Sequence, residues 1–173
     1  MTSEEWVSLT KLFMKTILET IVVPCASKYN LSTTQYTCLR YIYLHPDSSV
    51  INISKAFSIS TAAATTLVDR LVKIGLINRL PNPEDRRLVK LNLTEKGQDI
   101  FNAILNSEQE KWQILFDMLP QQSLHNLIES MTLVINLLLI NYENKEKMCL
   151  RCGTLHSPHC PVYIISEEKN NLG

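Results

Sequence analysis

The sequence predicts a mainly α-helical protein with one small β-hairpin. Only 4 glycines and 7 prolines occur in 173 residues, which argues against a turn-rich all-β fold. Long stretches instead place apolar residues three or four positions apart, the spacing of one helix face. Two short segments, 76–80 and 88–93, alternate apolar and polar residues on either side of a charged turn, as half-exposed strands do.

Capping residues and helix breakers divide the helical pattern into segments. Ser3 or the preceding Thr2 can cap the first helix, and Pro24 is expected to end it. Ser60 and Thr94 can cap later helices, and Gly75 stands where a C-terminal glycine belongs. The predicted helices cover residues 3–23, 32–44, 51–57, 61–74, 95–119 and 122–143.

The net charge of the chain is zero, so its overall charge does not predict a nucleic-acid partner. The distribution is uneven, however, and one segment concentrates basic side chains, which is sufficient for phosphate contacts. These side chains are Arg70, Lys73, Arg79, Arg86, Arg87, Lys90 and Lys96.

The N-terminus is acidic and lacks the basic, then apolar, pattern of a signal peptide. The most apolar run, 131–140, is expected to be too short to span a bilayer. We therefore expect a cytoplasmic protein without a membrane partner. Because the cytosol is reducing, its 5 cysteines are not expected to form structural disulfides.

Three short helices with a tight middle turn predict a helix-turn-helix, and the following hairpin makes it winged. In such modules the second helix of the pair, here 61–74, enters the DNA major groove. Small side chains allow close approach, and hydroxyls can bond phosphates or base edges. The alternative is an ordinary amphipathic helix with a solvated threonine face. The candidate DNA-binding residues on this helix are Ser60, Thr61, Ala62, Thr65, Thr66 and Arg70.

The turn of the hairpin carries Asp85, Arg86 and Arg87. Arginines at such a tip suit insertion into a narrow minor groove, where negative potential is concentrated. Asp85 could orient the guanidinium of Arg87 through a paired geometry. Taken by itself, the tip could also be a solvated charged turn.

Three stretches resemble the MarR family of bacterial transcriptional regulators: LSTTQYTCLRYI, FSISTAAATTLVDRLVKIGLINR and NPEDRRLVKLNLTEKG. The most specific piece is Asp-x-Arg followed by Leu-Thr-x-x-Gly. By this resemblance Arg87 matches the minor-groove arginine, Asp85 its partner, and Arg86 is a second candidate. Phe57 departs from the aliphatic residue that is common there, and the tail after Glu143 is an addition.

The resemblance implies a homodimer that binds pseudo-palindromic double-stranded DNA, usually as a repressor that a small ligand, metal or oxidant releases. It implies a winged helix-turn-helix plus a helical dimerisation domain. The expected divisions are 1–30 for a dimerisation helix, 31–97 for the DNA-binding domain, 98–143 for long dimerisation helices and 144–173 for a Cys-rich tail. Residues 131–140 support the dimer independently, because a helix apolar nearly all round needs burial on several sides. A monomeric helical core is the alternative.

The tail contains Cys149, Cys152 and Cys160, which with His156 form a three-Cys, one-His set typical of structural zinc. His159 is an alternative fourth ligand. An iron–sulfur cluster on the three cysteines, completed by Cys25 or an external ligand, is a second possibility. A reversible Cys149–Cys152 dithiol and a disordered tail with free thiols are the others.

Cys25 and Cys38 lie on or beside apolar helices and are expected to be buried thiols. No nucleophile–base pair, phosphate-binding glycine loop or catalytic carboxylate pair is evident, so an enzyme is not expected. A metal- or redox-sensing protein whose winged fold mediates protein contacts is the alternative function.

Overall fold

The computed structural model describes residues 2–81, 89–140 and 142 of the chain. It confirms a mainly helical fold with a two-stranded antiparallel sheet. The elements in chain order are α1 (Ser3–Ile17), η1 (Leu18–Val22), α2 (Val23–Ser27), α3 (Thr33–Leu44), α4 (Val50–Phe57), α5 (Thr61–Lys73), β1 (Ile77–Pro81), β2 (Val89–Leu93), α6 (Glu95–Asp117) and α7 (Gln121–Ile140).

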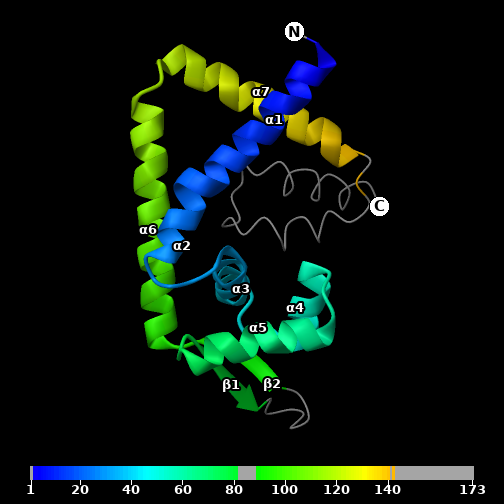
Figure 1. Cartoon of the computed structure of the whole chain (residues 1–173), viewed down its shortest axis with the longest axis vertical. Coiled ribbons are helices and arrows are strands. Elements are labelled where there is room, and N and C mark those ends of the chain that lie inside the picture. Colours follow the sequence, from blue (N-terminus) through cyan, green and yellow to red (C-terminus); the bar gives the residue numbers. More distant parts are fainter. Residues whose placement is uncertain (1, 82–88, 141, 143–173) are drawn as a thin grey trace, which may run out of the picture.

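The long helix α6 runs along one side of the molecule and joins its two ends (Figure 1). At one end α3, α4 and α5 gather with the hairpin, and at the other end lie α1 and α7. The buried core belongs to the first end, where α2, α3, α4, α5, both strands and α6 contribute apolar side chains. By contrast, α1 buries no residue and α7 buries only Leu139.

The first helical segment does not end at Pro24, which corrects the expectation from the sequence. A wide π turn, η1, follows α1, and the chain continues into α2 as far as Ser27. Pro24 stands in the first turn of α2. A proline is tolerated there because its missing N–H has no obligatory partner in a first turn.

Side-chain caps begin the helices at the residues that the sequence indicates. The hydroxyl of Ser60 accepts a hydrogen bond from the backbone N–H of Ala63 over 3.2 Å and so starts α5. Thr94 caps α6 through the N–H of Gly97 at 2.9 Å. Gly75 ends α5 at φ 76°, the left-handed region that favours glycine. The predicted caps and glycine stop are confirmed.

Gly97 marks the place where α6 approaches the start of the hairpin. A Cβ atom added at this position would lie 2.1 Å from the carbonyl oxygen of Leu76. The backbone N–H of Thr94 donates to the same oxygen over 3.0 Å. The absence of a side chain at Gly97 therefore allows α6 to begin directly against the chain that enters β1.

The hairpin is antiparallel, with Ile77 opposite Leu93 and Pro81 opposite Val89. Pro81 is thus the last residue of β1 and does not interrupt it, as a proline can at the end of an edge strand. On its other side β2 forms an isolated bridge between Leu91 and Ser48 of the α3–α4 turn. The hairpin is consequently attached through β2 to the turn between α3 and α4.

Helix α7 extends well beyond the apolar run 131–140. It contains 20 residues, has a mean hydropathy of 1.5 over its most apolar window, and is almost entirely exposed within one chain. By length and composition it could cross a bilayer. The expectation that the run 131–140 is too short to do so concerns only half of this helix, and α7 as a whole has the length required.

Candidate nucleic-acid interface

Helix α5 presents one apolar and one polar face because its apolar residues recur at helical spacing. Ala64, Leu67, Val68 and Leu71 are buried against the core. The opposite face carries the residues predicted to bind DNA. Within a single chain Ser60, Thr61, Ala62, Thr66 and Arg70 are exposed and Thr65 is partly exposed.

Two threonines of this face already use their hydroxyl hydrogens. Thr65 donates through Oγ1 to the carbonyl of Thr61 over 2.8 Å, and Thr66 donates to that of Ala62 over 3.0 Å. Such bonds to the preceding turn are a usual conformation of threonine in a helix. Each threonine therefore has the lone pairs of its hydroxyl oxygen and its methyl group available for contacts with a partner.

An ion pair joins α5 to the first strand of the hairpin. The guanidinium Nη2 of Arg79 on β1 lies 2.8 Å from Oδ1 of Asp69 on α5. Both side chains are substantially exposed, at 37% and 53%, so solvent screens their attraction. The pair therefore fixes how the strand meets the helix more than it stabilises the fold.

The second strand is attached to the turn between α3 and α4. Asp47 accepts a hydrogen bond from Lys90 Nζ at 3.0 Å and another from the amide of Asn92 at 2.8 Å. Its own backbone N–H donates to Oδ1 of Asn92 over 3.1 Å. The hydrogen bonds from Asn92 and Lys90 lower the pKa of Asp47, because they favour its charged form.

The comparisons with known proteins identify this arrangement. Residues 31–89 match the MarR family model. The chain carries a MarR-family domain. The matched segment contains α3, α4, α5 and β1 and ends at the first residue of β2, which is the whole of the helix-turn-helix together with most of the hairpin.

The MarR match extends to curated proteins and to solved structures. The regulator BilQ of Clostridioides difficile is 32% identical over 82 residues, 47% of this chain and 55% of that protein. The repressor MdtR of Bacillus subtilis is 29% identical over 103 residues, 60% and 65% of the two chains. The chain spans 62%, 55% and 53% of the first three curated relatives that it matches.

A crystal structure of Streptococcus pneumoniae FabT in complex with DNA has the same fold. It superposes with a TM-score of 0.64 at 22% identity and covers 78% of this chain and 95% of that one. The superposition therefore includes α-helical parts of this MarR protein outside the matched residues 31–89. It confirms the winged helix-turn-helix with additional helices that the sequence predicts.

Several predicted site residues fall outside the described part of this MarR protein. The wing residues Asp85, Arg86 and Arg87 lie between the ends of the two strands, in 82–88. The proposed metal ligands of the tail lie in 143–173; they are Cys149, Cys152, His156, His159 and Cys160. Among the described residues, no three His, Cys, Asp or Glu side chains are grouped so as to hold a metal ion.

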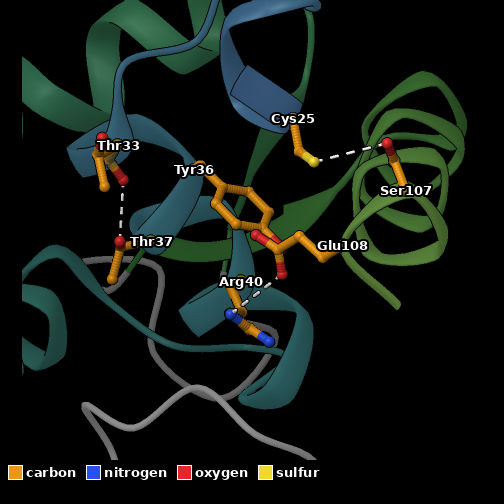
Figure 2. A network of polar contacts seen from close by, with 7 residues as sticks. All are labelled: Cys25, Thr33, Tyr36, Thr37, Arg40, Ser107 and Glu108. Atoms are coloured by element: carbon orange, nitrogen blue, oxygen red, sulfur yellow. Dashed lines mark hydrogen bonds and ion pairs between the residues drawn. The ribbon is translucent and has the colours of Figure 1, made fainter. Parts of the chain in front are cut away.

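Cys25 and Cys38 are buried, as expected, at 2% and 0% exposure. Cys25 donates from its thiol to Oγ of Ser107 over 3.5 Å, which joins α2 to α6 (Figure 2). Burial raises the pKa of the Cys38 thiol to about 12. Cys38 is therefore protonated at neutral pH and is a packing residue in this core.

A buried polar network connects the MarR helix-turn-helix to α6. The hydroxyl of Tyr36 on α3 donates to Oε2 of Glu108, and Arg40 Nη1 lies 3.8 Å from the same oxygen (Figure 2). Burial raises the pKa of Glu108, and the nearby Arg40 and the Tyr36 hydrogen bond only partly offset this effect. Desolvation likewise raises the pKa of Tyr36.

These connections could not be predicted from the sequence pattern. Asp69 and Arg79 are ten positions apart on different elements, and Tyr36 and Glu108 are 72 positions apart. No periodic pattern links residues at such separations. An acidic residue at an otherwise apolar position of α6 could have indicated the Glu108 site, because an acid at such a position is rarely fully buried without a partner.

Proposed function

We propose that this MarR protein is a transcriptional regulator that binds double-stranded DNA, with α5 in the major groove and the hairpin tip in the adjacent minor groove. One observation carries the proposal: the exposed polar face of α5 stands beside a hairpin that is fastened to it through Arg79 and Asp69. A helix followed by a wing in this relation suits two neighbouring grooves.

The chemistry of α5 favours readout of base edges over phosphate donation. Since Thr65 and Thr66 donate their hydroxyl hydrogens to the helix backbone, their oxygens are left to accept. Adenine N6 and cytosine N4 are the donors of the major groove, and a thymine methyl can meet the threonine methyl or Ala62. Arg70 is exposed, and the described residues offer it no ion pair, so it is available for a phosphate or a guanine.

We propose further that two chains associate through α1, α6 and α7. These helices line an apolar groove that includes Phe13, Trp112, Phe116, Ile128 and Met131. Exposed apolar surface of this extent on a soluble chain indicates a partner surface. Two copies would present two α5 helices, which suits a pseudo-palindromic site with half-sites about one helical turn apart.

Repression, and its relief by a small ligand, metal or oxidant, is the regulatory mode we propose. The curated repressor MdtR is among the relatives. The tail remains our proposed site for a metal, with Cys149, Cys152, Cys160 and His156 as zinc ligands or the three cysteines holding an iron–sulfur cluster. Metal analysis of anaerobically purified protein tests this: one colourless zinc per chain supports zinc, and a brown protein supports a cluster.

DNA binding is tested with duplexes that the purified full chain selects from a random pool. We expect salt-dependent binding to a palindromic duplex, with Arg70→Ala weakened by about 1–3 kcal/mol. Lys28→Ala is the control, because Lys28 is an exposed cation in the chain after α2, away from α5. Failure to enrich any sequence, or equal affinities of the two variants, would contradict the assignment of α5.

The same purified protein can be used to distinguish insertion of α7 into a membrane from packing of α7 against a second chain. If α7 packs against a second chain, the protein stays in solution as a dimer and does not float with lipid vesicles. Co-flotation with vesicles of neutral phosphatidylcholine would instead indicate that α7 enters the bilayer.

A further inference from the structure

The second strand of the hairpin is fastened by a small clasp, which we define as Asp47, Lys90 and Asn92. Both carboxylate oxygens of Asp47 accept from β2, one from Asn92 at 2.8 Å and the other from Lys90 at 3.0 Å. The backbone N–H of Asp47 donates to Asn92 over 3.1 Å. The reciprocal bonds between Asp47 and Asn92 define both position and direction, which a single ion pair would not do.

The backbone at Asp47 has an unusual conformation that allows these bonds. Asp47 has φ 64°, in the left-handed region that only Gly, Asn and Asp adopt with ease. The next residue, Ser48, continues the contact, since its carbonyl accepts from the N–H of Leu91 over 2.8 Å. The α3–α4 turn thereby acts as a short third strand on the free edge of β2.

The clasp lies close to the proposed DNA-contacting tip. Lys90 follows Arg87 by three positions in the sequence. On the other strand, Arg79 is bound to Asp69 of α5. The hairpin is therefore held at both edges by carboxylates of the helix-turn-helix, namely Asp69 and Asp47.

We propose that Asp47 is a positioning residue for DNA recognition: through Asn92 and Lys90 it sets the angle at which the hairpin tip meets the minor groove. The proposal rests on the DNA-binding function proposed above. Because the side chains of Asp47 and Lys90 are 54% and 30% exposed, their ion pair is screened and contributes little to folding. Its effect is thus on the direction of the hairpin and so on which flanking sequence is preferred.

The test compares two duplexes that share the same selected major-groove core. One carries A·T-rich flanks and the other G·C-rich flanks, because minor-groove width and potential differ between them. Fluorescence anisotropy gives the ratio of the two dissociation constants for wild type, Asp47→Ala and Asp47→Asn. Asp99→Ala is the matched control, since it removes an equal charge from an exposed site on α6.

We expect wild type and Asp99→Ala to prefer the A·T-flanked duplex, and Asp47→Ala to lose about fivefold of that preference. Asp47→Asn should keep most of it, because Asn tolerates the left-handed backbone and its amide oxygen still accepts from Asn92. An unchanged preference in Asp47→Ala would overturn the proposal. So would an equal gain in affinity for both duplexes, which would mean that Asp47 only neutralises Lys90. An equal loss of preference in Asp47→Asn and Asp47→Ala would overturn the geometric role as well.

A measurement without DNA separates this inference from the proposed function. Amide hydrogen exchange at Leu91 reports the bond to Ser48 in the free protein. We expect faster exchange in Asp47→Ala than in Asp47→Asn or Asp99→Ala, with thermal unfolding confirming that all three fold. If wild type does not bind DNA, the proposed function fails. If wild type binds DNA but the clasp variants leave both readouts unchanged, only the role of Asp47 fails.

Discussion

Tyr36 and Glu108 form a buried hydrogen bond between the helix-turn-helix and the long helix α6, with the Tyr36 hydroxyl donating to Oε2 over 3.1 Å. The other carboxylate oxygen of Glu108 has no hydrogen-bond partner among the described residues, and neither does Nε of Arg40. A partly satisfied network of this kind defines an orientation at the expense of stability. It joins α3 to α6.

We expect Glu108→Gln to be more stable than wild type at pH 8 and to lose this advantage in acid. The folded-state pKa of Glu108 is raised, so the folded protein binds a proton more tightly than the unfolded chain. The contribution of Glu108 is therefore fully present below its ordinary pKa of about 4.3 and is lost as pH rises through the folded pKa. Urea unfolding at pH 4 and pH 8 measures the difference; Glu110→Gln, an exposed neighbour, is the control.

Gly97→Ala should destabilise the fold more than Gly75→Ala. At Gly97 the new Cβ would meet the Leu76 carbonyl oxygen at 2.1 Å, so α6 must shift, at a cost of about 1–3 kcal/mol. At Gly75 nothing lies within 4 Å of the new Cβ, and only the backbone conformation is unfavourable, at about 1–2 kcal/mol. Chemical denaturation of both variants gives the order, and the reverse order would contradict the close approach of α6.

Arg87→Ala should weaken binding to the selected duplex by about 1–3 kcal/mol, as the loss of one groove contact does. The loss should shrink when the flanks are changed from A·T to G·C, since the arginine is proposed to enter a narrow minor groove. Anisotropy titrations at one fixed salt concentration measure both effects. Equal binding of Arg87→Ala and wild type to the A·T-flanked duplex would exclude a role for this residue at the tip.

Ile128→Glu should convert the dimer into monomers, because it places a charge in the apolar groove between α1, α6 and α7. Ser130→Glu introduces the same charge on the same helix, beside Asn126 on its polar stripe, and should leave the dimer intact. Sedimentation velocity distinguishes the two states. A wild-type chain that sediments as a monomer would remove the proposed dimer altogether.

Cys38 should not react with a thiol reagent in the folded protein at pH 8. It is fully buried, and its pKa of about 12 keeps the thiol protonated. Cys38→Ser provides the comparison: it should show as many reactive thiols as wild type when folded and one fewer in urea. A lower count for folded Cys38→Ser would show that Cys38 is accessible.

Local features of the sequence were sufficient to predict most of the helices. Ser60 and Gly75 bound α5 in the structure as they do in the sequence, because caps act on neighbouring backbone groups. Pro24 was misleading, since it stands in the first turn of α2, where a proline is tolerated, and does not end the helical segment. Helix α7 covers Gln121–Ile140, close to the predicted 122–143, because its apolar residues recur at helical spacing on both sides of residue 131.

Part of the candidate site could likewise be predicted from the sequence, and part could not. The polar face of α5 follows from helical spacing and could be predicted from Thr61, Thr66 and Arg70 alone. The attachments through Asp47 and Asp69 depend on which strand meets which turn, and such tertiary contacts are not encoded by local spacing. The sequence also could not show that the threonine hydroxyls bond back to their own helix.

The close contact between Gly97 and Leu76 has a mechanical consequence for α6. This helix has 23 residues and spans about 35 Å, and its first turn is fixed against the hairpin while its other end lies beside α1 and α7. A tilt of about 10° at its base would displace its far end by about 6 Å over that length. In the proposed dimer, a small change where the two chains meet would therefore alter the distance between the two α5 helices, and this distance would decide whether both can occupy one DNA duplex.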